Sequence, residues 1–386
     1  MQHRQRAFAV LNYQPYDRLP VVHFGFLRDT LRRWANEGHI SHELAEAQFD
    51  SNLADMEIGA RLGFDFNWQS VFAPAAGLWP GFERRVLDET SDGWRKVLTG
   101  NGVVILEKDD ARGIPPELDH LLKGRAEWDK HFVPRMQFTP ERVTQTVVRT
   151  PSFEARFDAG GREYLRANAW AHPLGLHCGS LYGWIRNWLG VVGSAYVQSD
   201  YPALFDEIIE TVGEMCYRCA EQTPEEVGGA FDFGHFWEDI CFKNGPLINP
   251  RVFRQKVGPH YRRITDLLRR HGVTIVSLDC DGWIDALVPI WLEYGVNVMF
   301  PIEVGTWNAS IAPWGEKYGP ELRGIGGMRK YIFAQDYAAV DAEVERLKPL
   351  VDLGGFIPCP DHRLPDDCKW ENVQYYCERM RKAFGG

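Results

Sequence analysis

The chain has no excess of positive charge. Its 386 residues include 43 lysines and arginines against 53 aspartates and glutamates, a formal net charge of −10. Proteins that bind nucleic acids usually present a basic surface, so this balance argues against a nucleic-acid partner. It does not exclude a small anionic substrate held by a few local arginines.

The sequence also lacks a long apolar run. No stretch approaches the roughly 18 uninterrupted apolar residues of a membrane-spanning helix. The first twenty residues, MQHRQRAFAVLNYQPYDRLP, have neither the apolar segment nor the cleavage site of a secretory signal. We therefore expect a cytoplasmic protein without a membrane partner.

Several catalytic and metal-binding motifs are missing. There is no P-loop, no GxSxG elbow, no HExxH, and no GxGxxG after the first β-rich run. The eight cysteines do not form the paired CxxC motifs of a zinc finger. A lone CxxC, Cys216 and Cys219, lies in a strongly helical run, which favours ordinary helix residues over a redox pair.

Short β-rich runs alternate with helical patterns along most of the chain. The helical run 249–272 begins with Asn249 as N-cap and Pro250 at the first helical position. A later helical run, 336–354, ends at Gly354, a plausible C-cap. Buried strands that are each followed by a helix indicate a parallel sheet, and eight of them close into a barrel. The predicted strands lie within 19–26, 63–69, 163–173, 227–240, 273–282, 296–305, 321–330 and 354–362.

The predicted fold is therefore a single (β/α)8 TIM barrel spanning 1–386. An open doubly wound sheet is the alternative, and the missing GxGxxG argues against it. Residues 82–131 break the βα pattern and are predicted to be an insertion between barrel units. Within it, 82–108 alternates in polarity between turn signals and predicts two or three antiparallel strands.

Ionisable residues follow most of the predicted strands, where α/β barrels place their active sites. Asp279, Asp281, Glu303, Asp361 and His362 fall after strands five, six and eight. Carboxylates with one imidazole suit a divalent metal, or else acid–base work by a high-pKa carboxylate and a histidine. A purely structural role, such as helix capping, is the third reading.

We accordingly predict His362, Asp281 and Glu303 as catalytic residues, and Asp279, Asp281 and His362 as metal ligands. Other polar and aromatic residues near the predicted strands are candidates for substrate binding: His23, Trp170, His172, His235, Glu238 and Arg329.

The C-terminal part resembles the uroporphyrinogen decarboxylase superfamily. The resemblance rests on GPLINP (245–250), VSLDCDG (276–282), WLEYG (291–295), GIGGMRK (324–330) and GGFIPCPDHRLPDDCKWEN (354–372). It implies a barrel enzyme with one of two chemistries. One is metal-free decarboxylation, and the other is methyl transfer involving a corrinoid, with a zinc ion held by His and Cys ligands.

Matching residues to the methyltransferase motif puts Asp279, Asp281 and His362 where those relatives have His, Cys and Cys. Such a harder ligand set suits Zn²⁺, Mn²⁺ or Fe²⁺ acting on an oxygen rather than a thiol. The resemblance then implies a demethylase that passes a methyl group from a small substrate to a separate corrinoid protein. This chain has no corrinoid-binding DxHxxG segment of its own.

Two other functions stay open. The first is a decarboxylase or metal-dependent lyase that acts on a small carboxylated substrate and uses His362. Decarboxylase relatives grip the substrate carboxylates with arginines just after the first strand. In this chain Arg28, Arg32 and Arg33 lie too far into the following helix to do so. A catalytically inactive small-molecule binding barrel is the other. The resemblance also implies a homodimer, as in decarboxylase relatives.

Overall fold

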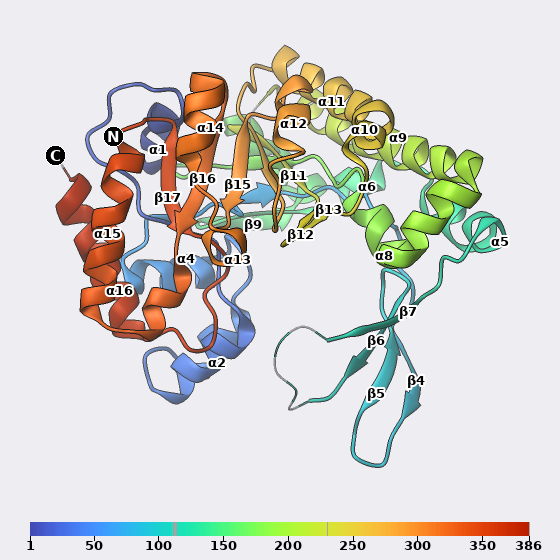
Figure 1. The fold of residues 1–386 in the computed structure, drawn as a ribbon, viewed down its shortest axis with the longest axis horizontal. Helices are drawn as coiled ribbons and strands as arrows, with labels where there is room; N and C mark the ends of the chain where they lie inside the picture. Colours follow the sequence, from blue (N-terminus) through green and yellow to red (C-terminus); the bar gives the residue numbers. More distant parts are fainter. Residues whose placement is uncertain (110, 112, 114, 230, 386) are drawn as a thin grey trace.

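A parallel sheet forms the centre of the molecule (Figure 1). The computed structural model describes residues 1–109, 111, 113, 115–229 and 231–385. Seven strands pair in the order β17-β16-β15-β14-β11-β10-β3, and β1 pairs separately with β2, all in parallel. Their bounds are β1 Val22–His23, β2 Phe66–Asn67, β3 Val71–Phe72, β10 Gly175–His177, β11 Phe233–Trp237, β14 Val276–Asp279, β15 Val298–Ile302, β16 Arg323–Met328 and β17 Phe356–Pro360.

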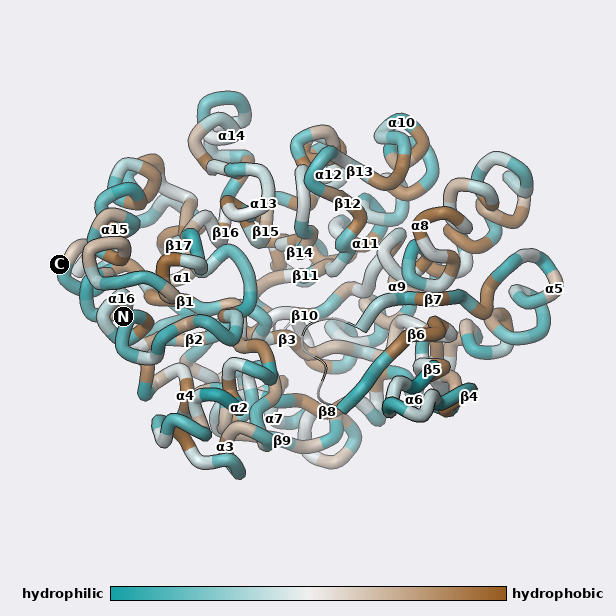
Figure 2. Tube along the Cα trace, turned by 60° about the horizontal axis from the view of Figure 1, so that its bottom comes forward, coloured by the Kyte–Doolittle hydropathy of each residue, from teal (hydrophilic) through white to brown (hydrophobic). Residues whose placement is uncertain are grey.

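The strands close into a ring. β2 and β3 are two pieces of the same barrel strand, one pairing with β1 and the other with β10. On the other side, the Leu364 N–H donates to the Gly25 carbonyl at 3.1 Å and the Leu27 N–H donates to the Leu364 carbonyl at 3.1 Å. This parallel bridge joins the ends of β17 and β1. In Figure 2 the strands follow one another around the ring, so the predicted α/β barrel is confirmed.

Helices cover the outside of the barrel (Figure 1). Among the described residues, none is both long and apolar enough to cross a membrane. The helices outside the barrel are α1 His3–Leu11, α2 Arg28–Asn36, α3 His42–Ala47, α4 Leu53–Leu62, α8 Gly183–Asp200, α9 Pro202–Val227, α10 Pro250–Val252, α11 Gly258–Arg270, α12 Val288–Glu293, α13 Val304–Trp307, α14 Ile311–Tyr318, α15 Tyr337–Val351 and α16 Trp370–Phe384.

Local sequence signals set several helix ends. The Asn249 side chain accepts a hydrogen bond from the Arg251 N–H at 2.9 Å, with Pro250 in the first turn, as the cap signal predicts. Asp336 caps α15 in the same way, accepting from the Ala339 N–H at 2.9 Å. Gly354 takes a φ of +73° just after α15, a conformation that favours glycine.

The prediction of the third strand was wrong. Residues 163–173 contain most of helix α7, Gly161–Ala167, and the strand that follows is β10, Gly175–His177. Trp170 and His172 therefore precede the barrel strand instead of following it. The other seven predicted strand segments each contain a barrel strand.

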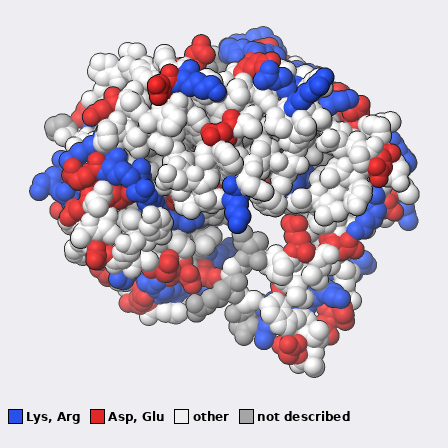
Figure 3. Space-filling model, in the orientation of Figure 1, with Lys and Arg blue, Asp and Glu red and all other residues white. Residues whose placement is uncertain are grey.

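An antiparallel sheet interrupts the barrel between β3 and β10. Its strands are β4 Arg85–Glu89, β5 Arg95–Leu98, β6 Val103–Glu107 and β7 Glu117–His120, paired in chain order. We call β4–β7 the arm. It projects on the side of the barrel where β15 to β17 end (Figure 1), and the space-filling view shows a hollow between it and the barrel body (Figure 3). Short elements return the chain to β10: α5 Arg125–Glu127, α6 Glu141–Thr144, and the hairpin β8 Val147–Thr150 and β9 Phe153–Arg156.

A buried arginine anchors the chain at the base of the arm. Arg142 is completely buried and donates to the carbonyls of Ala75 at 2.5 Å, Gly77 at 2.8 Å and Gln137 at 2.9 Å. It also donates to the carbonyls of Trp79 and Arg135. One guanidinium thus joins the segments before and after the arm, and satisfies carbonyl groups that would otherwise be buried without partners.

We expect Arg142→Met to destabilise the protein strongly. Methionine fills similar space but leaves these carbonyls without donors, at a cost on the order of 3 kcal/mol or more. Urea unfolding followed by circular dichroism measures the loss. Arg149→Met, which removes an arginine paired with Glu154 on the surface, is the matched control and should change stability little. Equal stability of the two variants would contradict this role.

Candidate functional site

Carboxylates gather where the barrel strands end. Asp239 follows β11, Asp279 and Asp281 end and follow β14, Glu303 follows β15, and Asp361 follows β17. With His362 they form what we call the mouth cluster. Burial raises the pKa of Asp239, Asp279 and Glu303, and the charge of Asp281 raises each of them further. The four residues predicted as catalytic or metal-binding, Asp279, Asp281, Glu303 and His362, all lie in the mouth cluster.

Asp281 and His362 form the central contact of the mouth cluster. His362 Nε2 lies 3.3 Å from Asp281 Oδ2, and the two side chains are 28% and 32% exposed, so a substrate can reach both. The other oxygen, Asp281 Oδ1, is buried and has no hydrogen-bond partner among the described residues. The His362 ring packs 5.5 Å from that of Phe24. This is the geometry of a carboxylate that orients an imidazole.

Asp279 lies deeper than this pair. It is 6% exposed, and its Oδ2 accepts a hydrogen bond from Gln69 Nε2 at 2.7 Å. Burial, reinforced by the charge of Asp281, raises the pKa of Asp279 well above its usual value. Asp279 is therefore suited to hold a proton as a neutral acid beside the Asp281–His362 pair.

Glu303 and Asp361 are tied to backbone amides at the rim. Glu303 accepts from the Gly282 N–H at 2.7 Å and from the Thr306 hydroxyl. Asp361 accepts from the Gly305 N–H at 2.8 Å and from the Lys330 N–H at 3.2 Å. Burial raises the pKa of both carboxyls, although these hydrogen bonds oppose it. Both residues hold the loops around the mouth in place.

Glu238, predicted to bind substrate, is fully buried, and its carboxylate oxygens accept hydrogen bonds from groups of the protein. Its carboxylate accepts from the N–H groups of Leu181 at 2.8 Å, Tyr182 at 2.9 Å and Gly183 at 2.7 Å, and from the Tyr261 hydroxyl. It therefore caps the amino terminus of α8.

His235 faces the barrel interior below the mouth. Its Nδ1 lies 2.7 Å from the Ser277 hydroxyl, and its ring lies 6.2 Å from that of Phe300. Burial lowers the pKa of His235 well below its usual value, so the ring is neutral near pH 7. Of the predicted substrate-binding residues, it is the one that the structure places under the mouth cluster.

His23 lies outside the barrel lumen, between β1 and α4. Its Nε2 is buried without a partner among the described residues, on the side of Gly59 in α4. Burial lowers its pKa to about 3. Arg329 follows β16 but is paired with Glu343 of α15 at 3.2 Å. The structure brings neither residue into the mouth cluster.

Trp170 and His172 lie at the opposite ends of the strands. The Trp170 indole N–H donates to Asp232, which precedes β11, at 3.3 Å. His172 stacks on His3 of α1 with ring centres 5.1 Å apart, and burial lowers its pKa to about 4. Both residues were assigned to the mouth because the third strand was predicted too early in the sequence. Neither residue is part of the mouth.

The structure adds residues that sequence reasoning missed. Gln69 reaches Asp279 from the break between β2 and β3, and Arg186 of α8 lies 2.5 Å from Asp239. Gln69 is the last residue of the predicted strand segment 63–69, and a polar residue at a strand end is a signal for the site that could have been used. Arg186 sits in the middle of a helical run, and nothing in the sequence marks it.

The predicted metal ligands engage other partners in this structure. Asp281 contacts His362, but the Oδ2 of Asp279 is held by Gln69. Over the described part of the chain, no three His, Cys, Asp or Glu side chains are arranged to hold a metal. The prediction of a metal site at Asp279, Asp281 and His362 is therefore not supported by the side-chain arrangement.

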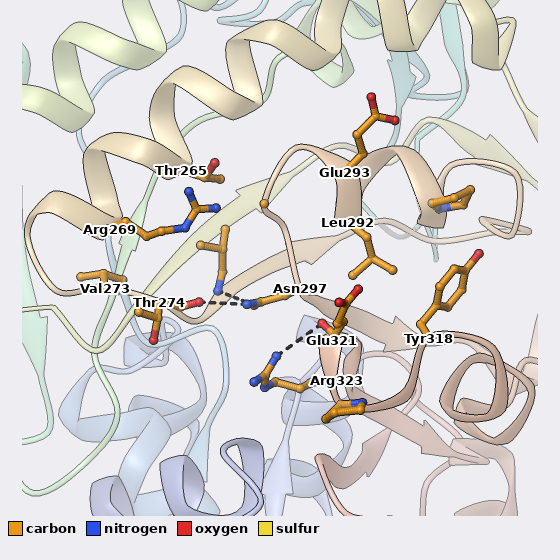
Figure 4. Close-up of a pocket in the computed structure, with 14 residues that line it drawn as sticks. Thr265, Arg269, Val273, Thr274, Leu292, Glu293, Asn297, Tyr318, Glu321 and Arg323 are labelled. Atoms are coloured by element: carbon orange, nitrogen blue, oxygen red, sulfur yellow. Dashed lines mark hydrogen bonds between the residues drawn. The ribbon is translucent and has the colours of Figure 1, made fainter.

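A cavity of about 770 Å³ lies at the other end of the barrel (Figure 4). It is lined by residues that precede or begin β14, β15 and β16, including Thr274, Asn297 and Arg323. Asn297 donates to the Thr274 carbonyl and accepts from the Val276 N–H, and Arg323 donates to the Glu321 carbonyl. These groups serve the fold, at the barrel end that usually contributes stability and not catalysis.

No family model matches the chain, and no curated protein matches its sequence. Among solved structures, a methyltransferase from Methanosarcina mazei is similar, with a TM-score of 0.61 and 12% identity over 99% of both chains. The chain shares the fold of that methyltransferase. A B12-independent methionine synthase from a Shewanella species has a TM-score of 0.44 and 10% identity, over 95% of this chain and 98% of the other, which is too distant to argue from. The fold implied by the sequence resemblance is confirmed.

A second set of carboxylates lies behind the mouth, on the outer side of β1 and β2. Asp50 accepts two hydrogen bonds from Arg363, at 3.0 and 2.5 Å. Asp55 is fully buried and accepts from Gln48 at 2.8 Å, the Ser51 N–H at 3.0 Å and Asn67 at 3.1 Å. Burial, together with the nearby charge of Asp50, raises the pKa of Asp55 to about 6.

We expect Asp55 to make the protein less stable as pH rises from about 4 to about 6. Its folded-state pKa lies above the unfolded value of about 3.9, so the folded state binds the proton more tightly and loses that advantage on ionisation. Stability of Asp55→Asn relative to the parent should therefore improve by up to about 3 kcal/mol across this window. Urea unfolding at pH 4, 5, 6 and 7 measures it, and a constant difference at all four values would refute the raised pKa.

We expect the purified protein to hold no stoichiometric Zn²⁺, Mn²⁺ or Fe²⁺ at the mouth, because Gln69 holds Asp279 and no three ligating side chains of the described residues are arranged to hold a metal. Mass spectrometry of the protein after incubation with each metal tests this. One equivalent of metal that is lost in both Asp281→Ala and His362→Ala, but kept in the surface control Asp341→Ala, would restore the metal site.

Proposed function

We propose that the chain is a methyltransferase-type enzyme that removes a methyl group from a small substrate at the barrel mouth. The observation that carries this proposal is the Asp281–His362 contact of 3.3 Å, partly exposed at the strand ends where barrel enzymes bind substrate. The fold shared with the Methanosarcina methyltransferase supports the same class of reaction.

His362 would supply the proton that the leaving group needs. When a methyl group is transferred from an oxygen or nitrogen, the electrons of the broken bond stay on that atom, which then takes up a proton. The ring nitrogen that does not face Asp281, Nδ1 of His362, would donate it, while Asp281 at Nε2 stabilises the charge of the protonated ring. Asp279, whose pKa is raised by burial and by Asp281, is a second acid within the cluster.

In this proposal Glu303 holds the loop that carries Asp281 in position and does not transfer a proton. Its two oxygens hold Gly282, next to Asp281, and Thr306. Fixing the Gly282 backbone fixes the direction in which Asp281 leaves the end of β14. His235 forms the neutral, partly apolar floor below, together with Phe300.

The methyl acceptor follows from the sequence resemblance. A corrinoid carried by a separate protein would supply the nucleophile that receives the methyl group. Such a partner must approach the strand ends, and the hollow between the arm and the barrel lies on that side (Figure 3). The arm has exposed apolar side chains that suit a protein contact: Val86, Leu87 and Leu118.

The decarboxylase alternative has less support. Arg28 and Arg32 both pair with Glu46 on the exposed surface of α2, at 3.4 and 3.3 Å, and do not reach the mouth. A carboxylated substrate would enter a cluster of carboxylates without a free arginine clamp, where like charges repel.

The test is demethylation of a panel of small methyl ethers, methylamines and methyl thioethers, with free cob(I)alamin as acceptor and absorbance of methylcobalamin as the readout. For a compound that is turned over, His362→Gln and Asp281→Asn should lower the rate about 10²- to 10⁴-fold, as expected for loss of acid–base catalysis.

Asp341→Asn, on the outer surface of α15, is the matched control and should keep full activity. Unchanged turnover in His362→Gln would overturn the assigned role. Release of carbon dioxide from a carboxylated compound in the absence of any corrinoid would favour the decarboxylase alternative instead.

A further inference from the structure

Three tryptophans cluster on the rim beside the mouth. Trp283 follows β14, Trp307 ends α13 after β15, and Trp314 lies in α14. The ring centres of Trp283 and Trp307 are 6.4 Å apart, and those of Trp307 and Trp314 are 6.0 Å apart. Trp283 is 43% exposed, so the cluster is open to solvent.

A carboxylate sits among these rings. Asp285 accepts hydrogen bonds from the indole N–H of Trp314 at 2.7 Å and of Trp283 at 3.0 Å. Both oxygens are therefore used by neutral donors. These bonds fix the orientation of the carboxylate and leave its negative charge in place.

The cluster borders a cavity of about 300 Å³. Trp307, Trp314 and Tyr318 supply aromatic walls and Asp285 supplies charge; we call this cavity the aromatic groove. A cation of the protein already uses one wall, since Lys317 Nζ lies 4.9 Å from the centre of the Tyr318 ring. Lys317 is itself exposed and can swing away.

We propose that the aromatic groove binds a methylated ammonium group. Such a cation has few or no N–H donors, so aromatic faces and an unneutralised carboxylate recognise it without new hydrogen bonds. A plain ammonium group is strongly hydrated, and aromatic walls do not replace the hydrogen bonds to water that it would lose. Lys317 is the internal competitor for the site. The proposal concerns binding and does not depend on methyl transfer at the mouth.

The experiment is calorimetric titration of the full chain with tetramethylammonium chloride, at constant ionic strength and with ammonium chloride as the reference salt. We expect saturable binding of tetramethylammonium that ammonium does not reproduce. Asp285→Asn should weaken binding about threefold or more, and Lys317→Met should strengthen it about two- to fivefold by removing the competing cation.

Lys348→Met, on α15 and paired with Glu345, is the matched control and should leave the affinity unchanged. The Lys317 variant changes only an exposed side chain, so its result stands even if Asp285→Asn disturbs the fold. Absence of saturable binding, equal binding of ammonium, or an affinity that Lys317→Met does not raise would each overturn the proposal.

Discussion

The buried carboxylate of Glu238 holds the end of β11, the start of α8 and α11 together. It accepts from three successive backbone amides, 181 to 183, and from Tyr261. Gly183 is required here, since a Cβ would lie 2.0 Å from the Glu238 carbonyl oxygen. With α8 fixed, Arg186 reaches Asp239 and neutralises one carboxylate at the edge of the mouth. The mouth cluster thus depends on a residue that does not belong to it.

Crowding of like charges gives the mouth its chemical character. Asp239, Asp279, Glu303 and Asp361 all have raised pKa values, with burial as the main cause and neighbouring carboxylates as a further cause for the first three. Backbone amides and Gln69 offset part of this cost without removing the negative charge. A site of this kind repels anions and favours neutral or cationic substrates, which agrees with the aromatic groove on the same rim.

The sequence pattern predicted the barrel because seven of its strands are apolar runs separated by helical patterns. The third strand failed because Tyr164, Leu165 and Trp170 in the segment just before β10 look like a β-rich run, although the first two lie in helix α7. Asp281 and His362 were expected after strands five and eight, and in the structure His362 Nε2 lies 3.3 Å from Asp281 Oδ2. The sequence pattern could not foresee that Asp279 is held by Gln69, since side-chain direction depends on tertiary contacts.

The anchor of the arm differs from the mouth in the kind of charge it uses. Arg142 is held by carbonyl oxygens alone, and no carboxylate pairs with it in the described part of the chain. A guanidinium stays protonated throughout the range in which carboxyls titrate. Acidification therefore protonates carboxyls at the mouth, while Arg142 at the base of the arm keeps its charge and its hydrogen bonds to the carbonyls.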